Sequence, residues 1–162
     1  PTPQPRMDGP PPIRFSSATP QYLPFLNYSP HPIMYDDARY PTAMHLHEAL
    51  KYLPTNPAFA EHIRRCPDVG QVHALSTQLE SQAPNSVRSD WLAVYLQSME
   101  EVLLHKFRQH ADLLALLLGT GDAPLIYADP VDTYWGEGGH NHLGKILERV
   151  RAELRREAWG LA

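Results

Sequence analysis

The sequence has little cysteine and no long apolar run. Cys66 is the one cysteine in 162 residues, so the chain forms no internal disulfide and has no cysteine pair for a zinc site. Its most apolar stretch, Leu113 to Leu118, is far shorter than the roughly 18 residues that a membrane-spanning helix requires. These absences favour a reducing compartment, and we predict an intracellular, cytoplasmic protein with no membrane partner.

Basic charge is also scarce. The chain has 14 lysine and arginine residues against 18 aspartate and glutamate residues, a formal net charge of −4. Sequence-independent binding of nucleic acid depends on basic side chains that neutralise phosphates. The composition therefore gives no electrostatic indication of nucleic-acid binding, although it leaves nucleic acid open as a substrate. The apolar share of 43% and the charged share of 20% are those of a globular protein.

Proline, by contrast, is abundant at the start of the chain. Residues 1–12 hold six prolines and one glycine, a composition that builds neither a helix nor a central strand. We predict an extended or disordered lead-in at residues 1–12. A chain of 162 residues is normally one domain, and we find no internal repeat, so a single domain is predicted at residues 13–162.

Apolar residues recur with helical spacing over most of the remaining chain. Their periodicity and the capping signals predict helices at 42–53, 56–65, 67–80, 90–109, 111–118 and from 141 onward. The predicted core stripe of the longest helix consists of Leu92, Leu96, Met99, Leu103 and Phe107. Short strands are predicted at 13–15 and 125–127, and an ordered loop with at most short edge strands at 19–41. The expected fold is mostly α, an α+β domain with a few short strands and about six helices.

The helix predicted at 42–53 has two distinct faces. Its core-facing stripe consists of Leu46, Ala49, Leu50 and Leu53. Met44, Glu48 and Lys51 lie on the opposite side, within about 60° of one another by the 3.6-residue period. A carboxylate and an amine placed in this way form either a surface ion pair or a reaction centre. Periodicity alone favours the ion pair, because such pairs are common on exposed helices.

The histidines raise the question of a metal site. The closest pairs are His45 with His47 and His140 with His142. Helical residues two apart point about 160° away from each other, so His45 and His47 cannot share a metal ion. Neither pair has a cysteine or carboxylate at ligand spacing. We predict no metal and no cofactor.

A glycine-rich stretch at 136–139 lies just before Asn141, the predicted cap of the last helix. It matches neither a dinucleotide-binding fingerprint nor a phosphate-binding loop with its terminal lysine. The free N–H groups at the start of a helix favour an anion. The stretch is therefore either a plain glycine turn or part of an anion site.

Seven short blocks occur in order along the chain. They are Phe25-Leu26-Asn27-Tyr28, Pro41-Thr42-x-x-His45-x-x-Glu48-Ala49-x-Lys51, Val87-Arg88-x-Asp90-Trp91, Met99 with Lys106-Phe107, Leu118-x-Thr120-Gly121-Asp122, Asp132-x-Tyr134-Trp135-Gly136, and Asn141-x-Leu143-Gly144-Lys145 with Arg151. Their order and spacing resemble the NADAR family. The resemblance covers the chain from about Ile13 to Leu154. The family is named for a proposed link to NAD and ADP-ribose.

The resemblance implies an N-glycosidase, an enzyme that cleaves the bond between the anomeric carbon C1 of a ribose and a nitrogen. Family members are associated with phosphoribosylamino intermediates of riboflavin synthesis or with removal of ADP-ribose from guanine bases. The implied partner is an ADP-ribose-like or phosphoribosyl small molecule, or an ADP-ribosylated nucleic acid as substrate. Such chemistry uses a carboxylate beside an oxocarbenium-like C1, a proton for the leaving nitrogen, and aromatic faces that stack on a base or cation.

The same resemblance assigns the site residue by residue. The catalytic residues that it implies are Lys51, Asp132 and Trp135, and we add Glu48 to them as a hypothesis. Lys51 would form an imine with C1 of an opened ribose. The substrate-binding residues that it implies are Asn27, Tyr28, Met44, His45, Arg88, Trp91, Tyr134, Gly136, Asn141 and Lys145.

This sequence departs from the family pattern at catalytic positions. Met44 stands where the family has a glutamate, and Tyr127 where a second acid is usual. A thioether cannot act as a base. However, Glu48 replaces the family's glutamine one helical turn further on, so a carboxylate is still presented about 5–6 Å away. Three hypotheses follow: an enzyme that uses Glu48, a module that binds ADP-ribose-like ligands without turnover, and a protein-interaction module that kept only the fold.

Overall fold

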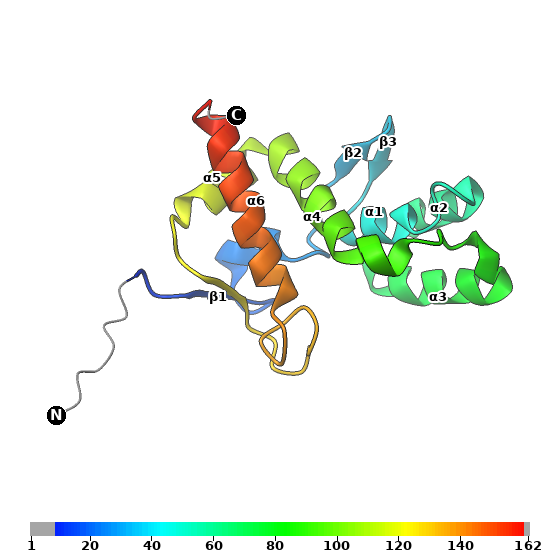
Figure 1. Ribbon diagram of the computed structural model, residues 1–162, viewed down its shortest axis with the longest axis horizontal. Helices are drawn as coiled ribbons and strands as arrows, with labels where there is room; N and C mark the ends of the chain where they lie inside the picture. Colours follow the sequence, from blue (N-terminus) through cyan, green and yellow to red (C-terminus); the bar gives the residue numbers. More distant parts are fainter. Residues whose placement is uncertain (1–8, 161–162) are drawn as a thin grey trace.

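The computed structural model describes residues 9–160 (Figure 1). Its α-helices are α1 (Ala43–Leu50), α2 (Pro57–Arg64), α3 (Val72–Gln82), α4 (Trp91–Gln109), α5 (Ala111–Gly119) and α6 (His142–Ala158). Its strands are β1 (Ile13–Phe15), β2 (Ile33–Tyr35), β3 (Ala38–Tyr40) and β4 (Leu125–Tyr127). Short 3₁₀ helices are η1 (Pro20–Phe25), η2 (Val69–Gln71) and η3 (Pro84–Ser86). The predicted fold, mostly α with a few short strands, is confirmed.

The strands form two small ladders. β1 pairs with β4 in parallel, with Ile13 opposite Leu125, and both strands lie where the sequence predicted them. β2 and β3 form an antiparallel hairpin within the predicted loop at 19–41. The two hairpin turn residues, Asp36 and Asp37, have φ of 49° and 63°, the left-handed values of a two-residue hairpin turn. The β1–β4 ladder fixes the start of the loop that leads to α6.

The core is built around α4. Figure 1 shows α4 in the middle of the molecule, with α1, α2 and α3 on one side and α5 and α6 on the other. Near the C-terminal end of α4, Phe107 packs against Phe25 with ring centroids 6.2 Å apart, and Phe25 packs edge-on against Phe15 at 5.5 Å. This aromatic contact joins α4 to η1 and β1, so the segment that follows η1 is held against α4.

The predicted core stripe of α4 is correct except at its start. Met99, Leu103 and Phe107 are buried and Leu96 is partly buried against the core, but Leu92 is 94% exposed. Trp91 occupies the buried position in the first turn of α4, where it packs against His47 with ring centroids 5.1 Å apart. The spacing identified the buried face over most of the helix. At the first turn, however, α1 packs against Trp91 rather than against the predicted Leu92.

The apolar segment at 111–118 is less buried than its composition predicts. In α5 only Leu113 and Leu117 are fully buried, because the helix packs on one side against α4 and α6. Within residues 9–160, no helix combines the length and the apolarity needed to cross a membrane. The intracellular location stays a prediction.

Helix α1 is shorter and more enclosed than the sequence indicates. It ends at Leu50 rather than at residue 53, and Thr42 caps it as predicted, because its hydroxyl accepts from the backbone N–H of His45. The interpretation that periodicity favoured, a surface ion pair of Glu48 with Lys51, is wrong. Glu48 is only 8% exposed, and Lys51 forms its ion pair with Glu80 of α3. Helices α2, α3 and α4 all pack on α1, which leaves it almost no solvent face.

The predicted lead-in lies mostly outside the described residues. Residues 1–8 fall there, and residues 9–12 are exposed and form no regular secondary structure. The lead-in at 1–12 therefore stays a prediction.

Replacing Gly144 by alanine is expected to destabilise the fold. A Cβ at this position of α6 would lie 2.0 Å from the carbonyl oxygen of Leu125 in β4, so helix and strand would have to separate. We expect a loss of at least about 1–3 kcal/mol in the free energy of unfolding, measured by urea denaturation. Gly119→Ala is the matched control, because a Cβ there meets nothing within 4 Å. Equal stability of the two variants would contradict the close helix–strand approach.

Candidate functional site

Two small cavities meet between α1, α4 and the loop that joins β4 to α6. The first, of about 200 Å³, is lined by Asn27, Met44, His47, Glu48, His73, Tyr95, Met99 and Trp135. The second, of about 110 Å³, is lined by Leu26, Asn27, Tyr28, Met44, Tyr127, Asp132, Trp135 and Leu143. We call them the Glu48 lobe and the Asp132 lobe, and the two together the inner site. Both lobes share Asn27, Met44 and Trp135, so they form one continuous region.

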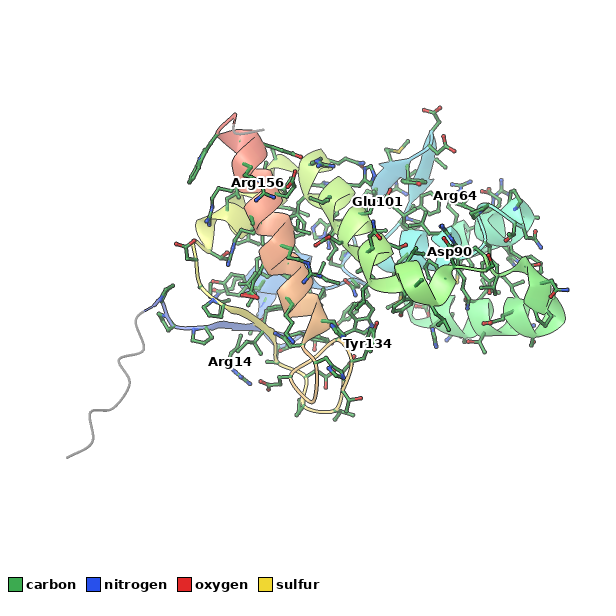
Figure 2. All side chains as sticks on the ribbon, in the orientation of Figure 1. Arg14, Arg64, Asp90, Glu101, Tyr134 and Arg156 are labelled. Atoms are coloured by element: carbon green, nitrogen blue, oxygen red, sulfur yellow. The ribbon has the colours of Figure 1, made fainter. Side chains whose placement is uncertain are left out.

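A larger cavity adjoins the inner site at Tyr95. This outer pocket has a volume of about 620 Å³ and is lined by Lys51, Glu80, Val87, Arg88, Ser89, Trp91, Leu92, Tyr95 and Tyr134. Figure 2 shows Tyr134 on the loop between β4 and α6, at the side where the lower end of α4 lies. The rings of Tyr95 and Tyr134 are 5.8 Å apart, so they form the boundary between the loop and α4.

Helix α1 supplies the carboxylate of the Glu48 lobe. The spacing of Met44 and Glu48, four residues apart, places both on the face that lines the lobe. Within the described residues the one hydrogen-bond partner of the Glu48 carboxylate is Nδ1 of His73, 3.4 Å away. Because His73 has a largely exposed side chain, this contact lies at the edge of the lobe. Glu48 is thus a buried acid whose oxygens are mostly uncommitted.

Asn27 offers an acceptor without a donor. Its side chain is buried, and Oδ1 has no hydrogen-bond partner within the described residues. Its backbone carbonyl accepts from the N–H of Met44 at 2.9 Å, which ties the segment after η1 to the start of α1. A buried acceptor left unpaired costs about 1–3 kcal/mol. A donor group of a ligand or a water would relieve this cost.

Asp132 shapes the loop that carries Trp135. Its Oδ1 accepts from the backbone N–H of Tyr134 at 2.9 Å and of Trp135 at 2.7 Å, which forms a tight local turn. Within the described residues Oδ2 has no donor, and the carboxylate lines the Asp132 lobe. The next residue, Gly136, has no room for a side chain, because a Cβ there would lie 2.6 Å from the carbonyl oxygen of Asp129. The glycine therefore permits the turn that places Trp135 in the wall of the inner site.

His47 is a site residue that the sequence analysis missed. Its ring is 3% exposed and is surrounded by Tyr95, Trp91 and Trp135, with centroids 4.7, 5.1 and 6.3 Å away. Burial lowers the pKa of His47, against the opposing effects of the Tyr95 carbonyl and Glu48, so the neutral imidazole is favoured. Its Nε2–H donates to the carbonyl of Tyr95 at 3.0 Å. The sequence offered one indication that His47 belongs to the site: it lies three residues after Met44, and residues three apart on a helix share a face.

Two further polar or sulfur-containing side chains of α4, Tyr95 and Met99, also line the inner site without having been predicted as site residues. Tyr95 and Met99 follow Trp91 at intervals of four residues on α4, a spacing that places all three on one face. Burial, followed by the charge of Glu48, raises the pKa of Tyr95, and burial raises that of Tyr127. Both phenols therefore stay protonated at neutral pH and are available as hydrogen-bond donors.

Lys51 and Arg88 line the outer pocket rather than the inner site. Nζ of Lys51 lies 2.7 Å from Oε2 of Glu80, and Arg88 bonds Asp90 at 2.6 Å. Burial acts to lower the pKa of Lys51, but the hydrogen bond to Glu80 and the charge of Glu48 outweigh it, so the pKa is raised. The outer pocket thus contains cations that already have acidic partners.

Four of the predicted binding residues line neither the inner site nor the outer pocket: His45, Gly136, Asn141 and Lys145. His45 bonds Thr42 and the carbonyl of Cys66 through its two ring nitrogens. The prediction that the side chain of Asn141 caps α6 is wrong. Its side-chain amide instead forms hydrogen bonds with the backbone of Leu125 and Tyr127 in β4. Lys145 is exposed.

No metal site is evident in the part of the chain that the structure describes, since no three histidine, cysteine or acidic residues cluster there. His45 and His47 point to different carbonyls, those of Cys66 and Tyr95. The absence of a cofactor stays a prediction.

The fold and the site define a mostly α domain whose central cavity combines a carboxylate, an amide and aromatic rings. The family model of the NADAR domain matches residues 13–155. The chain therefore belongs to the NADAR family.

Particular relatives extend over almost the whole chain. An N-glycosidase of Nostoc punctiforme is 36% identical, with 88% of this chain and 92% of that protein covered. The N-glycosidase YbiA of Escherichia coli is 35% identical, with 88% of each chain covered. The NMR structure of Escherichia coli YbiA superposes with a TM-score of 0.76 at 34% identity, over 92% of this chain and 88% of that one.

Proposed function

We propose that this protein is an N-glycosidase that hydrolyses a ribose C1–N bond, with ADP-ribosylated guanine or a related ribosylamine as substrate. One observation carries the proposal: Glu48, 8% exposed, lines the same lobe as the unpaired acceptor of Asn27 and the indole of Trp135. The relatives named N-glycosidases at 35–36% identity support the same class of reaction.

The proposed chemistry is a hydrolysis in which the inner site supplies charge and orientation. The C1–N bond breaks and its electron pair leaves with the nitrogen, which takes up a proton. Water adds its oxygen to the cation-like C1 and loses a proton to the Glu48 carboxylate, which also stabilises the positive charge at C1. Oδ1 of Asn27 accepts from a ribose hydroxyl, and Asp132 provides a second carboxylate in the neighbouring lobe.

The two cavities suit different parts of such a substrate. The Glu48 lobe, at about 200 Å³, has room for a ribose. The outer pocket, at about 620 Å³, falls in the range of small-molecule sites and has Trp91 and Tyr134 in its wall. Because Lys51 and Arg88 are already paired there, stacking rather than phosphate attraction would dominate in this pocket.

Met44 favours a second candidate function, a module that binds ADP-ribose-type ligands without turnover. Its thioether lines both lobes of the inner site, at the position where the family pattern has a glutamate. A thioether neither accepts a proton from water nor stabilises a cation as a carboxylate does. If Glu48 does not replace the missing acid, the inner site can still bind a ligand but cannot hydrolyse it.

One experiment separates these functions. The protein is incubated with ADP-ribosylated guanosine, release of guanosine and ADP-ribose is followed by chromatography, and ADP-ribose binding is measured by calorimetry. Product release supports the glycosidase, and binding without release supports the module. The absence of both would contradict both proposals and favour the protein-interaction hypothesis.

Lys51→Ala is expected to leave most of the turnover intact. The raised pKa of Lys51 keeps the ammonium form, whereas an imine requires the neutral amine. Loss of a half-exposed ion pair is worth up to about 1 kcal/mol, so KM should rise by no more than about fivefold. Borohydride reduction during turnover, followed by mass spectrometry, tests the imine directly. A covalent adduct in the wild type that Lys51→Ala lacks would establish the imine and overturn this expectation.

A further inference from the structure

Lys106 is a fully buried lysine outside the walls of the inner site. It lies on α4 with 0% exposure. Its Nζ lies 2.5 Å from the carbonyl oxygen of Pro24, 3.1 Å from that of Leu26 and 2.7 Å from Oγ of Ser29. An ammonium group has three N–H donors, so these three acceptors use all of them.

Burial of this charge is costly. Burial lowers the pKa of Lys106 to about 7, and within residues 9–160 no ion pair involves it. A buried cation without a carboxylate partner does not gain stability from charge pairing. The three hydrogen bonds of Lys106 are therefore the interactions that offset the cost of burying its charge.

Those hydrogen bonds all go to one segment, residues 24–29. The same segment carries Asn27 and Tyr28 into the inner site. The segment is also held by the bond between the Asn27 carbonyl and the Met44 N–H and by the packing of Phe25 against Phe107. Lys106 thus contacts the segment without lining either lobe, whereas Asn27 lines both lobes and its Oδ1 is unpaired within the described residues.

We propose that Lys106 is a positioning residue that fixes the segment 24–29 and thereby places the Asn27 amide for its ligand. Its kinetic consequence rests on the proposed glycosidase function, whereas its structural consequence does not. Ser29 extends the contact, because Oγ of Ser29 also lies 2.9 Å from Nδ1 of His31. The hydroxyl accepts from Lys106 and is also hydrogen-bonded to the imidazole.

The first test reports on Asn27 without any substrate. The side-chain amide signals of Asn27 are assigned by NMR in the wild type, Lys106→Met and Arg151→Met. Arg151 is the matched control, a buried cation on α6 that donates to Thr120 and the carbonyl of Ala123, away from the inner site. We expect the Asn27 signals to shift or broaden only in Lys106→Met. Unchanged signals in Lys106→Met would overturn the proposal.

A milder variant covers the case in which Lys106→Met does not fold. Ser29→Ala removes one of the three acceptors of Lys106 and leaves the two carbonyls. We expect a smaller displacement of the same Asn27 signals. Wild-type signals in folded Ser29→Ala, with Lys106→Met unfolded, would assign Lys106 a purely structural role and overturn the proposal.

The second test is kinetic and uses ADP-ribosylated guanosine. A displacement of about 1 Å at a reacting group costs on the order of 100-fold in rate, so we expect Lys106→Met and Asn27→Ala each to lose about that factor in kcat/KM. The double variant should lose no more than either single one, because both remove the same interaction. Additive losses would overturn the proposal. If the wild type has no turnover, the proposed function fails, and the NMR test still decides the role of Lys106.

Discussion

Glu48→Gln is expected to lower kcat for ribose C1–N hydrolysis by about 10²- to 10⁴-fold, the usual contribution of a general acid or base. The substitution keeps the size of a side chain that lines the Glu48 lobe and removes its negative charge. The affinity for ADP-ribose should change little, because Asn27 and Trp135 remain in place. Initial rates with ADP-ribosylated guanosine and calorimetry with ADP-ribose measure the two effects separately.

The control for this variant is a carboxylate elsewhere on the molecule. Glu100 pairs with Arg149 between α4 and α6 and lines neither the inner site nor the outer pocket. Glu100→Gln should therefore retain the wild-type rate. If Glu48→Gln turns over as fast as Glu100→Gln, the hypothesis that Glu48 replaces the family's missing acid is wrong.

Trp135→Ala is expected to reduce both binding and turnover. The indole forms a wall shared by both lobes and packs against Tyr95 and Tyr134, with ring centroids 5.8 and 4.9 Å apart. In the inner site the indole would contact the ribose, and the apolar contacts of a buried aromatic side chain are worth about 1.5–3 kcal/mol. That range corresponds to a loss of about 10- to 150-fold in ADP-ribose affinity, which calorimetry would detect.

Trp159→Ala is the matched control for Trp135→Ala, because it removes an indole outside the inner site. Trp159 follows α6, is 69% exposed and lies over the guanidinium of Arg155. Its replacement should leave ADP-ribose affinity unchanged. Equal affinities for Trp135→Ala and the wild type would show that the ligand does not occupy the inner site, whatever the result with Glu48→Gln.

Together the two variants separate the proposed functions. An enzyme that uses Glu48 loses turnover in Glu48→Gln and loses binding as well in Trp135→Ala. A module that only binds has no turnover to lose, and its affinity depends on Trp135 alone. The different outcomes follow because the two side chains line the same lobe but contribute charge in one case and an aromatic face in the other.

The sequence by itself determined the local structure. Thr42 starts α1 and Asn56 starts α2 because their side-chain oxygens accept backbone N–H groups of the first turn, and such caps depend on neighbours in the chain. Strands β1 and β4 also lie where the composition placed them. The motif order placed Asn27, Met44 and Trp135 in one site, and the structure brings these three together.

Only the tertiary structure decided which faces of the helices are covered. Helical spacing says which side chains share a face but not what packs on it. Spacing alone therefore favoured an exposed ion pair for Glu48 and a core position for Leu92, whereas Glu48 is buried and Leu92 is exposed. The same limit hid His47 and Tyr95, whose rings meet across α1 and α4. The contacts of Lys106 with residues 24–29 span about 80 positions of the chain, a separation at which no local pattern carries information.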